Sequence, residues 1–343
     1  MSRRLPGAGG GRTGIRQVAD LAGVGIASVS RVLSGQPGAS PQLTERVLAA
    51  ARQLGYAPNA LAQNLRRRTT RSIGFVGSDI RNPLLSSIVG GAEAVLSAAG
   101  YSVLLTNSGG VPDLDARRIE VLLQRQVDGL ILLPASEGDP ATLAALRGTD
   151  VPIVVIDRIL PVDVNACYVF SDHRAGVGDA TRHLLLQGHR RIGLAVAEGV
   201  RPSRERILAV EDAYRGLDLV ADILVELGAL STERGENAME AFLDRADPPS
   251  AIILGGNQLL EGALNVVRRR GLRLGKDISL VCCDDLPLSR LYDPPIATVM
   301  RDTSLLGQRA AEMLLEQLAH PHPIEPIVLP TWFIVRASCG KPT

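Results

Sequence analysis

The 343-residue sequence predicts a two-part chain: an all-α helix-turn-helix head, followed by an α/β body of two doubly wound parallel-sheet subdomains. Three observations support this prediction. Residues 18–35 hold two short apolar-periodic segments separated by Gly23-Val24-Gly25. From residue 72, apolar strand patterns alternate with helical patterns in two successive series. Residues 1–72 hold eleven arginines, no lysine and two acidic residues, a net charge of +9, against +1 for the whole chain.

The head is predicted to span residues 14–57, behind a glycine-rich disordered arm at residues 1–13. Val18, Ala19 and Leu21 form one apolar face before the glycines, and residues 26–33 form a second helix whose apolar side packs back on the first. Two helices joined by a short glycine turn form a helix-turn-helix. A third helix is expected at residues 41–54, with Ser40 as its N-cap. Spacing alone fits an ordinary helical hairpin equally well.

The charge of the head favours nucleic-acid binding. With the head at +9, the remaining residues carry −8, and a basic end on an acidic body is typical of a nucleic-acid-binding segment. In a helix-turn-helix, the second helix enters the major groove and its first residues reach the base edges. Ser28, Ser30 and Arg31 lie off the apolar stripe of that helix, where they suit phosphate and base contacts.

The body is predicted to span residues 72–338. In its first series, strands are expected at 73–76, 101–105, 129–133 and 151–156, with helices at 84–99, 115–126 and 141–146. In its second series, strands are expected at 192–197, 223–227, 251–254 and 278–283, with helices at 174–187, 204–215, 234–246 and 259–270. A closing segment at 297–336 has one helix, at 303–318, and two short strands.

Two facing doubly wound halves leave a cleft at the carboxyl ends of their strands, where ligands bind. Polar residues follow those strand ends in both series: Asp79, Asn82, Asp157, Arg158, Arg204, Arg206, Asn257 and Asp284. Any one of them could simply cap the next helix. As a set converging on one cleft, they favour a ligand site.

At the quoted residues the chain resembles the LacI/GalR family of bacterial transcriptional regulators, over residues 15–338. The resemblance rests on V-A-D-L-A-G-V at 18–24, V-S-R-V-L-S-G at 29–35 and G-Y-A-P-N-A-L-A-Q-N-L-R at 55–66. It implies a periplasmic-binding-protein-like body and a repressor that binds a pseudo-palindromic operator as a homodimer. It also implies that a small metabolite, a sugar or sugar acid, controls operator affinity from the cleft. Gly25 departs from the family's usual serine at the N-cap of the second helix.

The resemblance also implies roles for individual residues. Ile26, Ala27 and Arg31 occupy base-contact positions. Residues 58–71 become a hinge helix and linker, with Asn59 and Ala62 on the face of Leu65, which wedges into the minor groove; a plain basic linker is the alternative. Asp157, Arg206, Asn257 and Asp284 hold the effector. Asn82-Pro83-Leu84-Leu85 lacks the family's usual aromatic pair, so a neutral sugar, a sugar acid or another metabolite all stay open.

Other classes fit less well. An enzyme is not expected, because the sequence has none of the common nucleophile, metalloprotease, phosphate-loop or dinucleotide motifs. Asp284-Asp285 cannot flank one glycosidic bond, since adjacent strand residues point to opposite faces. A sugar-binding transport protein would need export. We therefore expect a cytoplasmic protein without cofactor, metal or membrane span. The subdomains are predicted at 72–168 plus 298–320 and at 169–297 plus 321–338.

Overall fold

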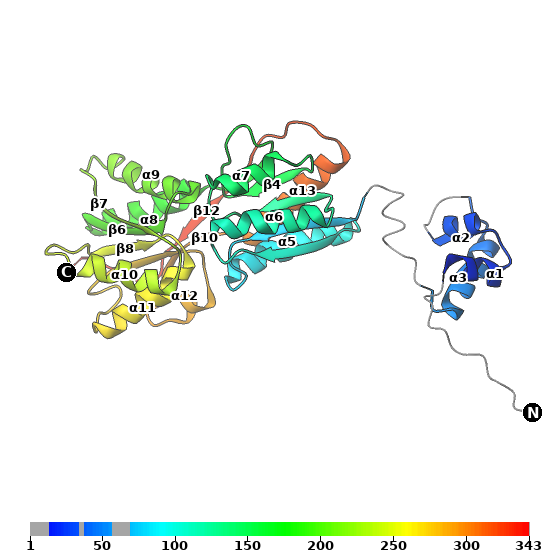
Figure 1. Ribbon diagram of the computed structural model, residues 1–343. Helices are drawn as coiled ribbons and strands as arrows, with labels where there is room; N and C mark the ends of the chain where they lie inside the picture. The colour runs from blue at the N-terminus through cyan, green and yellow to red at the C-terminus, as the bar shows by residue number, and fades with distance from the viewer. Residues whose placement is uncertain (1–13, 34–37, 57–68, 343) are drawn as a thin grey trace, which may run out of the picture. The chain divides into compact units, whose positions relative to one another are not determined.

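The computed structural model describes residues 14–33, 38–56 and 69–342 (Figure 1). The chain divides into two compact units, Met1–Thr70 and Arg71–Thr343. We call residues 14–56 the head and residues 71–342 the body. The arm expected at residues 1–13 and the hinge positions Asn59, Ala62 and Leu65 lie outside the described residues.

The described head consists of α1 (Ile15–Ala22), α2 (Ile26–Leu33) and α3 (Pro41–Gln53). α1 ends at Gly23, whose left-handed φ of 62° favours glycine. Arg46 of α3 donates a hydrogen bond to the carbonyl of Ala22 at 2.5 Å, so α3 satisfies the carboxyl end of α1. Val18, Val29 and Val47, one from each helix, are fully buried together. The helix-turn-helix predicted from the two glycines is therefore present.

The body contains two six-stranded sheets with the same plan. The first runs β11-β5-β4-β3-β1-β2 and the second β12-β10-β9-β8-β6-β7. The strands of the first sheet are β1 (Ser72–Gly77), β2 (Ser102–Asn107), β3 (Gly129–Leu132), β4 (Ile153–Ile156), β5 (Cys167–Ser171) and β11 (Ile327–Leu329). Those of the second are β6 (Arg191–Ala197), β7 (Asp222–Gly228), β8 (Ala251–Leu254), β9 (Ser279–Cys283), β10 (Ala297–Arg301) and β12 (Thr331–Ile334). Neighbouring strands pair in parallel, except that β12 is antiparallel to β10.

Helices cover both faces of each sheet (Figure 1). In the first subdomain they are α5 (Pro83–Ala98) and α13 (Thr303–Ala319) on one face, with α6 (Pro112–Gln124) and α7 (Pro140–Arg147) on the other. In the second they are α8 (His173–Gln187) and α9 (Arg201–Arg215) on one face, with α10 (Thr232–Leu243) and α11 (Leu260–Arg269) on the other. Short helices η1 (Asn257–Leu259) and α12 (Pro287–Leu291) follow β8 and β9.

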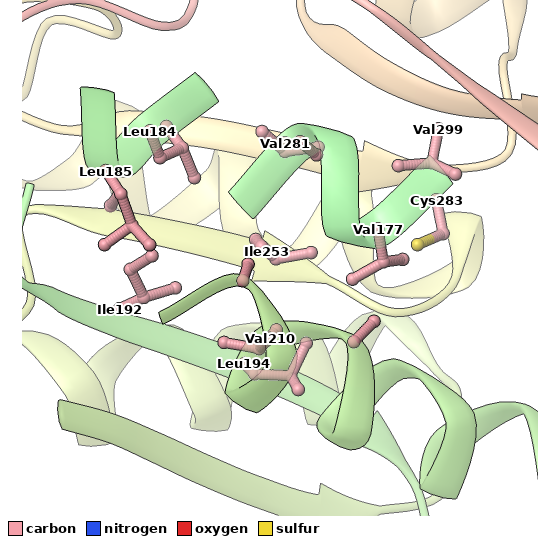
Figure 2. Close-up of a cluster of buried hydrophobic side chains, with 14 of the residues drawn as sticks. Val177, Leu184, Leu185, Ile192, Leu194, Val210, Ile253, Val281, Cys283 and Val299 are labelled. Carbon is pink, nitrogen blue, oxygen red and sulfur yellow. The ribbon is translucent and has the colours of Figure 1, made fainter. Parts of the chain in front are cut away.

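Burial of apolar side chains holds each layer in place. Figure 2 shows the core between α8, α9 and the second sheet, where Val177 and Val210 face Leu194 and Ile253. In the first subdomain, α5 and α13 approach closely through glycine. A Cβ atom added at Gly307 would lie 1.9 Å from the carbonyl oxygen of Ile88, so a larger residue there would force the helices apart.

The predicted subdomain boundaries were wrong in the closing segment. Residues 298–320 were assigned to the first subdomain, but β10 belongs to the second sheet. Residues 321–338 were assigned to the second, but β11 pairs with β5 in the first. Pro330 explains the error: it separates β11 from β12 within one apolar run, so the two strands enter different sheets. β5 also crosses the boundary expected at residue 169.

The structure thus gives a first subdomain of residues 71–171 and 302–330, and a second of residues 172–301 and 331–342. The chain passes between them after β5, after β10 and after β11, and these crossings place the carboxyl ends of both sheets at one cleft. None of the helices in the described ranges combines the length and apolar character that a membrane-spanning segment needs.

Candidate functional site: recognition helix and interdomain cleft

The amino-terminal half of α2 presents its outer face to solvent. Ile26 is 43% exposed, and Ala27 and Arg31 are also exposed, while Val29 on the inner face is fully buried. Ser28 and Ser30 are half-buried at the edge of the outer face. The predicted base-contacting side chains therefore share an accessible face of the second helix. That face is the one that a helix-turn-helix lays in the major groove.

Gly25 begins α2 in the role expected of an N-cap. Its carbonyl oxygen accepts the backbone N–H of Ser28 at 2.9 Å and that of Val29 at 3.2 Å. A Cβ atom at Gly25 would meet nothing within 4 Å, so the family's usual serine would fit there. The helix keeps its first turn without a capping hydroxyl.

In the body, an inner cavity of about 70 Å³ lies at the carboxyl ends of the strands, with lining residues from both subdomains. Six of the eight strand-end residues predicted for this site line it: Asn82, Asp157, Arg158, Arg206, Asn257 and Asp284. Arg204 and Asp79 do not. The carboxylate of Asp79 is held by Arg81 at 3.0 Å, and Asp79 lines a neighbouring space of about 530 Å³. A third space of about 310 Å³ shares Asp284 with the inner cavity.

Arg301 joins the two subdomains at the base of the cavity. From the end of β10 it donates to Asp284 at 2.7 Å and forms a close ion pair with Asp157 at the end of β4. Asp157 also accepts the backbone N–H of Ser171 at 2.6 Å. Burial opposes ionisation of Asp157, but His173 and Arg301 hold its pKa well below the usual range. Both carboxylates expected to bind a ligand are therefore already paired with a cation.

Sequence reasoning missed Arg301 because residues 298–320 were assigned to the first subdomain. The rule that selected the other residues would have found it, since Arg301 is the last residue of a strand. Asp284 and Asp285 lie just beyond β9 (Ser279–Cys283), and Asp284 has a left-handed φ of 71°, so the strand alternation assumed for this pair was wrong. Asp285 accepts from Arg336 at 2.7 Å and from Ser289 at 2.9 Å, whereas Asp284 accepts from Arg301, so the two carboxylates have different partners although both line the third space.

Glu137 is a second residue that the sequence did not reveal. It follows β3 in the first subdomain and reaches the amino end of α9 in the second. Its carboxylate accepts the backbone N–H of Arg201 at 2.7 Å and the guanidinium of Arg204 at 2.7 Å. A carboxylate at a helix amino end is favourable because of the unpaired N–H groups there. Arg204 is therefore committed to Glu137 and does not line the inner cavity.

Two asparagines make a third link across the cleft. Asn257 Nδ2 donates to Asn82 Oδ1 at 2.8 Å. The same oxygen accepts the backbone N–H of Leu84 at 3.0 Å, so Asn82 also caps α5. Both readings of Asn82 considered for the sequence, helix cap and cleft residue, describe this one side chain.

Arg206 lies deep in the second subdomain, 5% exposed, beside an unprotonated histidine. It donates to the carbonyl of Gly255 at 2.7 Å, and its other terminal nitrogen lies 3.3 Å from His173 Nδ1. Burial, with the nearby charge of Arg206, lowers the pKa of His173 to about 4. His173 is therefore neutral at pH 7. Among the described residues, no group of three histidine, cysteine or acidic side chains is arranged to hold a metal ion.

Comparison with known proteins follows the same division of the chain. Residues 14–59 match the model described as "Bacterial regulatory proteins, lacI family", and residues 181–339 match the "Periplasmic binding protein-like domain". The chain is 31% identical to the transcriptional repressor PurR of Haemophilus influenzae (strain PittEE), over 89% of this chain and 91% of that repressor. It is 29% identical to the repressor CytR of Escherichia coli (strain K12), over 90% of each chain.

Solved structures agree with the sequence relatives. The Lac repressor dimer bound to operator and an anti-inducer has a TM-score of 0.83 and 27% identity, over 96% of this chain and 99% of that one. The transcriptional regulator CelR in complex with cellobiose has a TM-score of 0.70 and 30% identity, over 95% and 100% of the two chains. Head and body together are therefore shared with these proteins.

Proposed function

Because the chain belongs to the lacI family of bacterial regulatory proteins, we propose that it is a transcriptional repressor controlled by a small metabolite. The head binds operator DNA, and the cleft of the body binds the metabolite and changes operator affinity. The observation that carries this proposal is the exposed face of α2, with Ile26, Ala27 and Arg31 accessible on a helix-turn-helix. A regulator of this kind acts in the cytoplasm, at the nucleoid, and catalyses no reaction.

In the head, Arg31 is the residue best suited to read a base. Arginine is the commonest reader of guanine, through O6 and N7, and a good bidentate contact discriminates by about 1–3 kcal/mol. Ile26 and Ala27 offer apolar contact to a thymine methyl group, and Ser28 and Ser30 reach phosphates. We also propose that Asn59, Ala62 and Leu65, which lie outside the described residues, contact the minor groove of the operator.

The protein acts as a homodimer on a two-fold operator. One head contacts too little DNA for a tight specific site, and two heads on a symmetric pair of half-sites double the contact. The related Lac repressor is a dimer in its operator complex, which supports the same assembly here. The effector is a sugar or a related metabolite, as the cellobiose complex of CelR and the cleft residues of this chain suggest.

Selection from a pool of random duplexes tests the proposal. The full chain should enrich a two-fold symmetric sequence, and residues 71–343 alone should enrich nothing. The shorter chain is a compact unit by itself, so its failure to bind would reflect loss of the head rather than unfolding. Enrichment of no sequence by the full chain, or of the same sequence by the body alone, would favour the alternative of a sugar-binding or hydrolytic protein without a DNA role.

A further inference from the structure

The inner cavity contains more positive than negative charge. Its lining includes the guanidinium groups of Arg158, Arg206 and Arg301, but only the carboxylates of Asp157 and Asp284. His173, which contacts Arg206, is neutral at pH 7 because burial lowers its pKa to about 4. One positive charge is therefore left without a counter-charge in the lining of this small space.

Arg301 uses both carboxylates, so the excess charge lies on the other two arginines. Arg301 forms an ion pair with Asp284 at 2.7 Å and a second, closer ion pair with Asp157. Within residues 69–342, neither Arg158 nor Arg206 forms a salt bridge. Arg158 donates only to the carbonyls of Pro134 and Asp157, at 3.0 Å each. Buried cations are ordinarily paired, so the lack of a salt bridge within the described body is unusual for the buried Arg206, and the half-buried Arg158 beside the same cavity also lacks one.

Arg206 has an N–H donor that forms no hydrogen bond within the described residues. It is 95% buried, and its Nε atom has no hydrogen-bond partner among the described residues. An unpaired buried donor on a charged group costs free energy, so a partner that accepts from it is strongly favoured. Burial lowers the pKa of Arg158, the carboxylates of Asp157 and Glu137 oppose that shift, and the charges of Arg301 and Arg206 add to it, so the three arginines are close enough to repel one another.

We propose that the effector is an anionic metabolite whose carboxylate or phosphate group lies between Arg158 and Arg206. This inference rests on the proposed function and specifies its ligand class. Guanidinium groups bind such oxyanions through paired, charge-assisted hydrogen bonds. The anion supplies the missing counter-charge, whereas the hydroxyl groups of a neutral sugar would accept hydrogen bonds but supply no negative charge.

The shape of the cleft fits a ligand with a charged end and a polar body. At about 70 Å³ the inner cavity is well below the size of an ordinary ligand pocket, so it admits one compact group. Asn82 and Asn257 line both this cavity and the outer space of about 530 Å³. Ser231, Thr232 and Glu261 line that outer space and suit the hydroxyl groups of a sugar-like body.

Matched pairs of ligands test the proposal on the full chain. Thermal unfolding and calorimetry at constant ionic strength would compare D-gluconate, D-galacturonate, D-glucose 6-phosphate and D-ribose 5-phosphate with their neutral parent sugars. We expect at least one anion to bind at least about tenfold more tightly than its parent, the advantage of one charge-assisted contact. The carboxylate and phosphate arms identify the group. Equal binding of anion and parent, or binding of no anion in the panel, would overturn the proposal.

Three variants locate the bound anion. Arg206→Gln and Arg158→Gln should each weaken the binding anion about 10- to 100-fold. Arg215→Gln changes the same charge on the same helix as Arg206, but Arg215 pairs with Asp212 on the surface, so affinity should not change. If Arg206→Gln does not fold, Arg158→Gln decides, because Arg158 is only half-buried. Unchanged affinity in the folded variants would overturn the assignment.

These measurements use no DNA, so the two proposals fail separately. A chain that enriches a symmetric duplex but binds no anion retains the repressor function and refutes the anionic effector. A chain that binds the anion through Arg158 and Arg206 but enriches no duplex retains the ligand site and refutes the repressor function.

Discussion

The two subdomains of the body share one strand order but play opposite parts in the direct contacts across the cleft. Across the cleft, the first subdomain supplies acceptors, through Asn82, Glu137 and Asp157. The second supplies donors, through Asn257, Arg204 and Arg301. The strand order therefore determines which loops meet at the cleft. The side chains on those loops determine which hydrogen bonds and ion pairs join the two subdomains. Three of the four predictions below test this division into acceptors and donors, and one tests the buried histidine beside the central contact.

The largest expected effect comes from removing the central acceptor. Asp157→Asn should lower the free energy of unfolding of the body by about 3–5 kcal/mol, because it removes one partner of a buried ion pair. Asparagine tolerates the left-handed φ of 51° at this position, so the variant changes charge rather than backbone. Urea unfolding followed by the fluorescence of Trp332, the chain's single tryptophan, reports on the body.

Asp163→Asn is the matched control. Asp163 pairs with Arg147 at 2.7 Å, but its side chain is 58% exposed, so its loss should cost about 0–1 kcal/mol. Similar losses in the two variants would mean that the link through Arg301 adds no more than a surface pair.

Low pH should lower the free energy of unfolding of the body, because it favours the protonated form of the buried His173. This side chain faces Asp157, Arg206 and Arg301. Its pKa falls from 6.5 to about 4 on folding, so between these pH values the unfolded chain binds the proton and the folded chain does not. The free energy of unfolding should therefore fall as pH drops from 6.5 to 4, by up to about 3 kcal/mol. Urea unfolding across this range, with His173→Gln as reference, measures it. A slope as steep in the variant would exclude His173 as the cause.

A smaller loss of stability is expected from removing the contact that Glu137 makes across the cleft to the amino end of α9. Glu137→Gln keeps an acceptor for the backbone N–H of Arg201 but removes the negative charge facing Arg204 and the amino end of α9. About 1 kcal/mol should be lost, an effect that added salt reduces in the wild type. Glu205→Gln on α9 is the control, since Glu205 pairs with the exposed Arg174. If both variants lost the same free energy of unfolding, and salt did not change that loss, the contact of Glu137 with Arg204 and α9 would be no more than a surface ion pair.

The smallest expected effect comes from the two asparagines, because replacing an amide by a carboxylate removes a donor but keeps an acceptor. Asn82 uses only its carbonyl oxygen, toward Leu84 and Asn257, so Asn82→Asp should change the free energy of unfolding by less than about 0.5 kcal/mol. Asn257→Asp sets an acceptor against the acceptor of Asn82 and should cost about 1 kcal/mol. Thermal unfolding of both variants gives the comparison. The reverse order of losses would refute the acceptor role of the first subdomain.

Local patterns predicted most of the elements, because the causes of those elements are local. They missed β5, and the closing segment has three strands where two were expected. Gly23 ends α1 where a left-handed residue is required, and Ser40 accepts from Leu43 to begin α3 as predicted. Strand-end residues such as Asp157 and Asp284 reached the cleft because parallel strands align their carboxyl ends.

The errors arose where pairing is non-local. Nothing near Pro330 shows that β11 and β12 join different sheets, and the position of Arg301 depends on that choice. Glu137 follows a strand without any periodic signal, and its partners across the cleft, Arg201 and Arg204, lie 64 and 67 residues along the chain, beyond the reach of local patterns. Asp79 was expected in the inner cavity, but Arg81, two residues away, holds its carboxylate outside it.

The central claim is that the cleft of the body controls DNA binding by the head, and linkage offers its most direct test. Fluorescence anisotropy would give the affinity of the full chain for its selected duplex, with and without a saturating amount of the tightest-binding anion. Calorimetry would give the affinity for the anion, with and without the duplex. We predict that both affinities change by the same factor, about 5- to 150-fold, because coupling between two sites is reciprocal. Two affinities that are each unaffected by the other ligand would contradict the account.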